Sequence, residues 1–203
     1  KYKEGDSLAV QFEGTNRGEI LVFTDKQQVY KAKLADFEDT KASQLGTFLA
    51  SKLSMDAGET VKTVLYAADY SGEALLCFEN GKVARVPLSA YETKTNRKKL
   101  INAYSDKSPL VKVMPLYGDI ECAAYSTEGR ALIFSTALLA PKTGKSTQGV
   151  GVMTLKPRYK LSDVVPLSET GIKNISRYRV RSLPAAGALL KDEDRGEEQL
   201  TLL

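Results

Sequence analysis

The chain has 203 residues, of which 42% are hydrophobic and 27% are charged, so it can bury a core as one large or two small domains. It contains no histidine, which excludes Ser-His-Asp and Cys-His catalysis and most zinc sites. Its net charge is +4, and it shows neither a membrane-spanning run nor a signal-peptide pattern. We therefore expect a non-catalytic, cytoplasmic protein without metal or cofactor.

The first predicted element is a strand over residues 3–12. Its pattern returns later as the last strand of each repeat, so residues 1–14 are interpreted as the closing strand of a preceding unit. The sequence lacks an initiator methionine and opens inside a repeat, so we expect it to belong to a longer protein.

One hairpin pattern then occurs three times, starting at Glu19, Glu73 and Ile120. Each copy has an apolar run, a short polar turn and a second apolar run. The first runs, such as 20–23 and 74–78, are continuously apolar, which predicts strands buried on both faces. The return runs alternate apolar and polar residues, which predicts one wet face. Asn80-Gly81 predicts a type I′ turn.

Each hairpin is followed by a polar, basic loop, covering residues 40–46, 93–99 and 142–149. A further apolar strand, clearest at 150–155, comes next, and an acidic turn with a closing strand ends each unit at 56–65, 106–113 and 161–165. Units of about 50 residues suit one blade of a propeller. We therefore predict an all-β, propeller-like fold of four-stranded blades, with about three full repeats (19–66, 73–114, 120–165) and a partial one, within a domain over residues 1–183.

Cys77 and Cys122 lie in apolar runs at matching repeat positions, so they are interpreted as core residues in a reducing compartment. Residues 177–181 alternate Arg with Tyr or Val, which predicts a strand with three arginines on one face. Residues 184–203 are interpreted as a flexible acidic tail, with a short helix at 185–191 and a disordered or docking peptide at 199–203. Residues 191–203 carry −3, so the body carries +7, which suggests a polyanionic partner.

Three motifs carry a resemblance to a known family. They are the hairpin 21–31 with its Phe23-Thr24 step, the loop 147–152 and the Gly-Glu turn 58–61. Together they resemble the C-terminal DNA-binding domain of bacterial type IIA topoisomerase A subunits, those of DNA gyrase and topoisomerase IV. The resemblance implies a β-pinwheel, a disc of strand-exchanging blades whose basic rim bends duplex DNA. It also implies a monomeric, nucleoid-associated domain that cuts nothing itself and works, away from membranes, with the ATPase B subunit and the rest of the A subunit.

The gyrase members of that family carry a Gln-Arg-Arg-Gly-Gly-Lys-Gly box, and no such run occurs here. Its absence favours a topoisomerase IV-like subunit over a supercoiling gyrase. Three units are also fewer than the family's five or six, so either the disc is small and open or further blades lie upstream. Two alternatives stay open: a gyrase A C-terminal domain, or a propeller that binds protein, although the chain has no Trp to line a pocket.

A DNA-bending rim requires cations repeated along one edge, because regularly spaced phosphates bind them with release of counterions. The candidate DNA-binding residues lie in the basic loops and the arginine cluster: Lys41, Lys94, Arg97, Lys98, Lys99, Lys142, Lys145, Gly144, Gly149, Arg177, Arg179 and Arg181. The two glycines would allow close backbone approach to phosphate. Lys31, Lys33, Arg85 and Arg130 are second-rank candidates. For Lys41 or Lys142 alone, an ordinary solvated surface residue is an equal alternative, whereas three consecutive cations at 97–99 favour DNA contact. For 177–181, a strand that closes the ring against residues 8–10 is an equal alternative.

Overall fold

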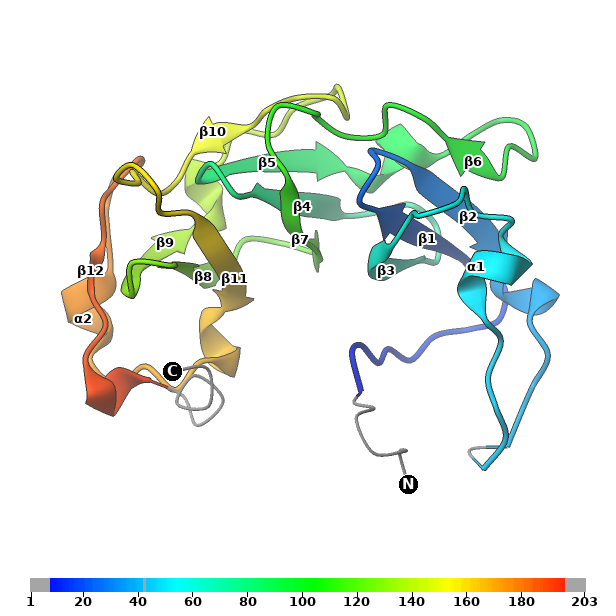
Figure 1. Cartoon of the computed structure of the whole chain (residues 1–203), viewed down its shortest axis with the longest axis horizontal. Coiled ribbons are helices and arrows are strands. Elements are labelled where there is room, and N and C mark those ends of the chain that lie inside the picture. The colour runs from blue at the N-terminus through cyan, green and yellow to red at the C-terminus, as the bar shows by residue number, and fades with distance from the viewer. Residues whose placement is uncertain (1–7, 42, 196–203) are drawn as a thin grey trace.

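The structure is a computed structural model that describes residues 8–41 and 43–195. Three four-stranded antiparallel sheets, which we call blades 1 to 3, follow one another in an arc (Figure 1). Blade 1 has the order β3 (Val61–Ala67), β1 (Glu19–Thr24), β2 (Val29–Lys33), β6 (Lys99–Leu100). Blade 2 has the order β7 (Leu110–Leu116), β4 (Glu73–Phe78), β5 (Lys82–Pro87), β10 (Val150–Gly151). Blade 3 has the order β11 (Leu161–Pro166), β8 (Glu121–Ser126), β9 (Arg130–Ser135), β12 (Ala188–Leu189).

The three predicted hairpins are confirmed as β1–β2, β4–β5 and β8–β9. Their first strands are buried on both faces from the second residue onward, as their continuous apolar runs predicted. The prediction of a type I′ turn is wrong, because only Gly81 has positive φ (82°). Gly129 (79°) and Gln27 (54°) take the same conformation, so each hairpin turns through one left-handed residue.

The innermost strands β3, β7 and β11 confirm the closing strands that the sequence predicted. The Gly-Glu turn before β3 owes its shape to Glu59. The Glu59 carboxylate accepts hydrogen bonds from Thr24 Oγ1 (2.5 Å), the Tyr30 hydroxyl (2.7 Å) and the Asp56 backbone N–H (3.0 Å). The motif therefore ties the closing strand to its own hairpin.

The outermost strand of each blade comes from a later part of the chain. β6 follows the hairpin of blade 2 but pairs with β2, and β10 follows the hairpin of blade 3 but pairs with β5. Each of these strands has two residues, shorter than the strand predicted at 150–155, because the chain then turns away to continue its own blade. Strand exchange therefore links successive blades.

The core lies mainly between neighbouring blades. Leu21 and Phe23 of blade 1 pack with Leu76 and Phe78 of blade 2, and a second cluster joins blades 2 and 3. Cys77 and Cys122 are both buried and free in this second cluster, as predicted, and burial raises the pKa of the Cys122 thiol to about 11. The blades are thus held by apolar burial, the dominant favourable term in folding.

Short helical turns connect the strands and cover the ends of the arc. Residues around α1 (Leu49–Lys52) pack on the outer face of blade 1. Residues around α2 (Ile175–Tyr178) pack on the far face of blade 3. A 3₁₀ turn follows each hairpin, and two more lie near the C-terminus: η1 (Leu34–Asp36), η2 (Leu88–Tyr91), η3 (Thr136–Leu138), η4 (Leu167–Glu169) and η5 (Asp192–Asp194). No helix in the described ranges is long and apolar enough to span a membrane.

Three expectations differ from the structure. Residues 8–14 form no strand; Phe12 instead stacks on Tyr66, with ring centroids 5.5 Å apart, while residues 3–7 lie outside the described ranges. Residues 177–181 are not a strand, because α2 ends at Tyr178. Within the predicted tail, β12 lies in place of the predicted helix and the 3₁₀ turn η5 follows it. Residues 196–203, and with them the predicted terminal peptide, lie outside the described ranges.

Candidate nucleic-acid interface

Three segments, which we call straps, run across the outer strands of the blades: strap 1 (92–103) on blade 1, strap 2 (140–153) on blade 2 and strap 3 (179–190) on blade 3. Figure 1 shows β6, β10 and β12 on the outer side of the arc, with β3, β7 and β11 on the inner side. Each strap is fixed to its blade by its exchanged strand and by the turn of the hairpin, and straps 2 and 3 share a further backbone contact at their start.

The first contact is made at equivalent positions of the return strands. In straps 2 and 3 the start of the strap donates: the Lys142 N–H to the Arg85 carbonyl (2.8 Å) and the Val180 N–H to the Ile133 carbonyl (2.9 Å). In strap 1 the return strand donates instead, from the Lys31 N–H to the carbonyl of Lys98 beside β6 (2.8 Å), which extends the pairing of β2 with β6. The second contact is the exchanged strand itself. The third is made by the carbonyl of the left-handed turn residue, Gln27, Gly81 or Gly129, which accepts from the end of the strap.

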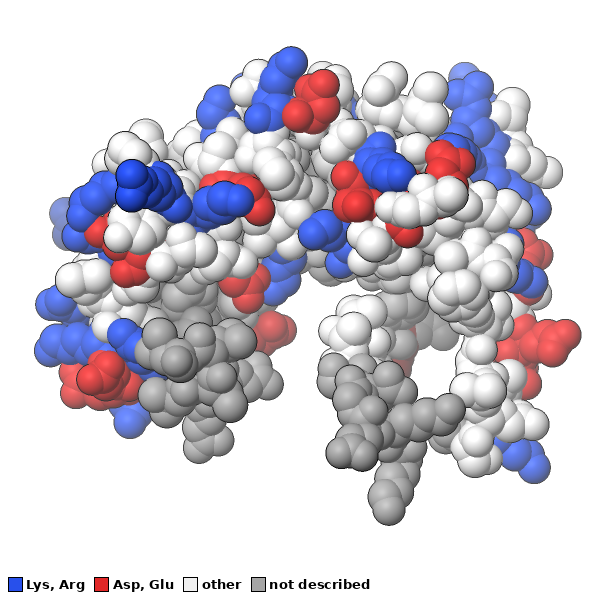
Figure 2. Space-filling view, in the orientation of Figure 1, with Lys and Arg blue, Asp and Glu red and all other residues white. Residues whose placement is uncertain are grey.

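This equivalence unites two features that the sequence analysis treated as separate. Arg179 and Arg181 of the arginine cluster lie at the start of strap 3, as Lys142 of the basic loop lies at the start of strap 2. Most predicted site residues therefore lie along one margin of the molecule. Figure 2 shows lysine and arginine side chains along the upper and left margins of this face, interspersed with acidic ones.

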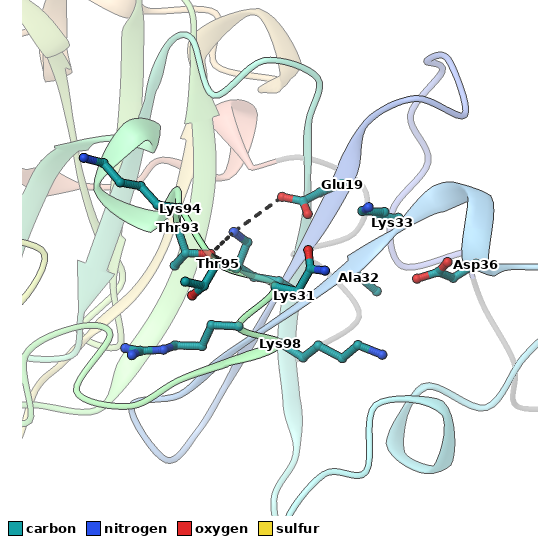
Figure 3. Close-up of a pocket in the computed structure, with 11 residues that line it drawn as sticks. Glu19, Lys31, Ala32, Lys33, Asp36, Thr93, Lys94, Thr95 and Lys98 are labelled. Atoms are coloured by element: carbon teal, nitrogen blue, oxygen red, sulfur yellow. Dashed lines mark hydrogen bonds and ion pairs between the residues drawn. The ribbon is translucent and has the colours of Figure 1, made fainter.

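Strap 1 carries the densest group of cations. Lys94, Arg97 and Lys98 are exposed, and none of them forms an ion pair with another described residue. They line a cavity of about 320 Å³ together with Lys31 and Lys33 of β2 (Figure 3). In Figure 3 the side chains of Lys94 and Lys98 extend away from the strap in different directions, and Glu19 and Asp36 line the same cavity.

Lys99 differs from its neighbours because it is engaged within the protein. Its ammonium lies 2.7 Å from a carboxylate oxygen of Asp56 and 5.6 Å from the centre of the Tyr30 ring. The hydrogen bond to Asp56 raises the pKa of Lys99, and the same contact lowers the pKa of Asp56. Lys99 therefore fixes strap 1 to the Gly-Glu turn, which makes it a weaker candidate for DNA contact than Lys98.

Strap 2 contributes Lys142, which is exposed, and Lys145, which is half-buried, and neither forms an ion pair within the described residues. The two glycines of this strap have different roles. A Cβ at Gly144 would meet nothing within 4 Å, so Gly144 leaves space for an approaching backbone. Gly149 has φ of 74°, its N–H donates to Thr147 Oγ1 (3.2 Å), and a Cβ there would clash with the Val83 carbonyl. Gly149 is thus required for strand exchange.

The three arginines at 177–181 lie in three different environments in the structure. Arg179 forms a bidentate ion pair with Glu121, with both N–O distances at 2.8 Å. Arg177 lies over the ring of the buried Tyr178, and Arg181 is exposed. The predicted strand face with three arginines does not form, because Arg177 and Tyr178 lie in the helical turn α2. The Tyr178 hydroxyl holds this turn by donating to the Asp194 carboxylate (2.8 Å).

The role of Arg179 follows from a glutamate that begins the hairpin of every blade. Glu19 lies 3.4 Å from the Lys31 ammonium, and Glu73 lies 2.6 Å from the Arg85 guanidinium. In blade 3 the equivalent strand position holds Ile133, and Arg179 supplies the cation from outside the hairpin. Sequence reasoning missed this role, although the missing basic residue at position 133 was a signal for it.

Replacing Arg179 with alanine should therefore destabilise blade 3 more than it weakens DNA binding. The Arg179–Glu121 ion pair is partly exposed and screened by solvent, so we expect a small but measurable fall in the midpoint of urea unfolding. Duplex affinity should change less than twofold under conditions where the variant is folded. Urea unfolding and fluorescence anisotropy with a labelled duplex measure the two quantities, and a larger loss of affinity than in Arg181→Ala would contradict this assignment.

Lys41 is not on a strap that crosses a blade. It is exposed, and residues 38–41 and 43–48 project from blade 1 at the lower right of Figure 1. The structure thus brings the cations of straps 1 to 3 onto one outer margin and leaves Lys41 apart from them.

The comparisons with known proteins agree with this architecture. No family model matches the chain. It is 28% identical over 157 residues to the A subunit of DNA topoisomerase 4 from Staphylococcus epidermidis, an alignment that covers 76% of this chain and 20% of that protein. The crystal structure of the C-terminal domain of DNA topoisomerase IV superposes with a TM-score of 0.79 at 20% identity, over 96% of this chain and 66% of that one. The DNA gyrase A C-terminal domain superposes with a TM-score of 0.61 at 16% identity, over 90% of this chain and 64% of that one.

These solved structures show the class of fold. The resemblance predicted from the repeated motifs is also confirmed: in sequence and in fold, the chain resembles the C-terminal domain of type IIA topoisomerase A subunits. It spans about a fifth to a quarter of the length of the curated relatives that it matches.

Proposed function

We propose that the chain is the DNA-binding and DNA-bending domain of the A subunit of a type IIA topoisomerase, and that it presents the transported duplex to a catalytic core elsewhere in the full protein. The observation that carries the proposal is the repetition of cation-bearing straps on the outer margin of successive blades. A duplex that follows this margin meets lysines and arginines at each blade. Its bending costs several kcal/mol, which many phosphate contacts together offset.

We further propose that the full subunit is topoisomerase IV-like and not a supercoiling gyrase. The absence of the Gln-Arg-Arg-Gly-Gly-Lys-Gly box supports this, and so does the higher TM-score against the topoisomerase IV domain. The domain itself is non-catalytic, and its partners in the bacterial cytoplasm are duplex DNA, the ATPase B subunit and the rest of the A subunit. A decatenation and a supercoiling assay of the full enzyme distinguish the two alternatives, and ATP-dependent negative supercoiling would contradict the first.

A salt titration of duplex affinity tests the DNA-binding role. Five cations of straps 1 and 2 have no ion-pair partner among the described residues: Lys94, Arg97, Lys98, Lys142 and Lys145. If each neutralises one phosphate, the plot of log affinity against log salt should have a slope of about −4.5. Fluorescence anisotropy with duplexes of unrelated sequence measures this slope. A flat response would contradict the proposal.

One observation favours a second candidate, a protein-binding module. A groove of about 610 Å³ on the inner side of the arc is lined by apolar and polar residues, the apolar ones including Phe12, Tyr66 and Tyr117, and Tyr117 is 65% exposed. Exposed apolar patches are typical of protein interfaces. This candidate predicts salt-insensitive binding that Tyr117→Ala weakens, whereas DNA binding on the outer margin should not respond to that substitution.

A further inference from the structure

Arg85 of the return strand β5 joins blade 2 to blade 3. Its side chain is 12% exposed, and its guanidinium donates to three acceptors that belong to three separate elements. They are a carboxylate oxygen of Glu73 at the start of β4 (2.8 Å), a carboxylate oxygen of Asp119 in the connection from β7 to β8 (2.8 Å) and the Thr136 carbonyl at the start of η3 (2.9 Å). The first acceptor belongs to blade 2, and the other two stand immediately before and after the hairpin of blade 3.

Hydrogen bonds hold both sides of this contact in place. Thr136 is fully buried, and its Oγ1 donates to Asp119 (3.1 Å) and accepts from the Ile120 backbone N–H (2.9 Å). On the blade 2 side, the Arg85 carbonyl accepts from the Lys142 N–H at the start of strap 2 (2.8 Å). A guanidinium presents its donors in one rigid plane, so contacts to several elements at once fix the orientation of these elements.

The residue at the equivalent position differs from blade to blade. In blade 1 it is Lys31, whose ammonium lies 3.4 Å from Glu19 of its own hairpin. Towards blade 2 this ammonium contacts only uncharged groups, the Thr93 hydroxyl (3.0 Å) and the Tyr70 ring, whose centre is 5.0 Å away. In blade 3, whose far face is covered by α2 and not by a blade, the residue is Ile133. A cation thus stands where another blade follows, and among the described residues it reaches a carboxylate across the junction only in blade 2.

Two more ion pairs cross the junction between blades 2 and 3, but they are more exposed to solvent. Lys112 of β7 lies 3.1 Å from Asp163 of β11, and Lys160 lies 2.8 Å from Glu79 after β4. Their lysine side chains are 36% and 58% exposed, so solvent screens them more than it screens Arg85. None of the ion pairs in the described part of the chain joins blade 1 to blade 2. Arg85 therefore makes the best shielded ion pair between neighbouring blades.

We propose that Arg85 is a positioning residue that fixes the angle between blades 2 and 3, and with it the bend that straps 2 and 3 impose on a duplex. These straps lie on the outer side of the two blades (Figure 1), so the angle between the blades sets the spacing and direction of the cations on the straps. The guanidinium is occupied by acceptors within the protein, so Arg85 acts through other residues and not through a phosphate contact of its own. The part of the proposal that concerns the duplex rests on the proposed function, whereas the part that concerns the angle does not.

Spin labels on the folded chain measure the angle in the absence of DNA. Ser89 of η2 and Ser162 of β11 are exposed, and labels on Ser89→Cys and Ser162→Cys report on the junction between blades 2 and 3. Labels on Lys62→Cys of β3 and Ser89→Cys report on the junction between blades 1 and 2. The native Cys77 and Cys122 are fully buried, so they should react slowly with the label. Double electron–electron resonance then gives the distribution of each distance.

Two substitutions break the contact in different ways. Arg85→Lys keeps the positive charge but replaces the planar group with a single ammonium, and Asp119→Ala removes the carboxylate across the junction while leaving the pair of Arg85 with Glu73. Both should broaden the distance distribution between blades 2 and 3 and leave that between blades 1 and 2 unchanged. Asp56→Ala is the matched control, because Asp56 and Asp119 are 48% and 49% exposed, and the 2.7 Å ion pair of Asp56 with Lys99 lies within blade 1. This control should leave the distribution between blades 2 and 3 unchanged.

The same variants are then saturated with a duplex that carries a fluorescent donor and acceptor at its ends. Bending a duplex costs energy, so a looser junction should bend it less and lower the energy transfer between its ends. The slope of log affinity against log salt should keep the value of the parent chain, because neither substitution removes a cation. Distance distributions that stay unchanged in both variants overturn the proposal, and so does a broadened distribution with unchanged energy transfer.

Failure of the proposed function gives a different result. If the parent chain does not bind duplex DNA, the proposed function is contradicted, and the spin-label distances still decide whether Arg85 fixes the angle between the blades. If Asp119→Ala does not fold, Asp119→Asn replaces it, since it removes the charge and keeps an oxygen that can accept from the Thr136 hydroxyl. The same broadening is expected from this variant, and an unchanged distribution overturns the proposal.

Discussion

Removing the three unpaired cations of strap 1 by Lys94→Ala, Arg97→Ala and Lys98→Ala should lower duplex affinity by roughly 500-fold near 0.1 M salt. Each phosphate contact contributes about 0.9 to the slope of log affinity against log salt, which is about eightfold in affinity between 1 M and 0.1 M salt. The slope itself should become shallower by about 2.7. The side chains are exposed and make no described ion pair, so the free energy of unfolding should remain within about 0.5 kcal/mol of the parent.

A matched triple variant separates a local interface from a general effect of net charge. Lys62, Arg158 and Lys173 are also exposed and make no described ion pair, but they lie on none of the straps. Their replacement by alanine removes the same charge and should cost less than about fivefold in affinity, through the long-range field alone. Equal losses in the two triple variants would show that the outer margin is not the interface.

Asp194→Ala should detach the C-terminal segment from blade 3. The buried carboxylate accepts from the backbone N–H groups of Lys173 (2.7 Å) and Asn174 (2.9 Å) and from the Tyr178 hydroxyl (2.8 Å). Its removal leaves three buried or half-buried donors without a partner, and hydrogen bonds to charged groups are worth about 1.5–3 kcal/mol each, though not additively. We expect a loss of roughly 3–5 kcal/mol by urea unfolding, with a smaller loss in Asp194→Asn, which keeps an acceptor oxygen.

The same carboxylate makes this segment sensitive to acid. The pKa of Asp194 is lowered below its ordinary value, and the hydrogen bond from the Asn174 backbone N–H is the largest cause. A carboxylate with a lowered folded-state pKa stabilises the fold fully above its unfolded pKa of about 3.9 and loses this contribution as the pH falls through the folded value. Amide exchange of Leu190 should therefore accelerate relative to the amides of β4 as the pH falls below about 4. Parallel behaviour of both sets of amides would contradict this prediction.

The hairpins and closing strands could be predicted because their signals are local and repeated. The continuous apolar run 20–23 and its alternating return strand identify one hairpin, and the recurrence of this pattern identifies the blade. The exchanged strands were predicted poorly because a two-residue strand is too short to show an alternation of apolar and polar residues. Their pairing with the preceding blade also depends on contacts between residues that are distant in sequence. Both Lys99–Asp56 and Arg179–Glu121 join separate segments in this way, so neither was predictable from local pattern.

The C-terminal segment shows most clearly where sequence reasoning stopped. Its acidic composition predicted a flexible tail, because charge-rich segments generally cannot bury enough apolar surface to order themselves. Tertiary contacts outweigh composition here: Tyr178 is buried, Asp194 accepts from three donors around it, and β12 covers the edge of β9. Composition alone does not predict that a polar residue will be buried with all its hydrogen-bond partners.

By itself, the sequence determined the number of repeats, the hairpins within them and the basic character of the loops that follow, since all three depend on the order of residues along one short segment. Only the tertiary structure decided which blade each loop crosses, which cations remain unpaired and why Gly149 must be glycine. Those properties depend on which distant backbone and carboxylate groups approach each side chain, and that is settled when the blades pack against one another.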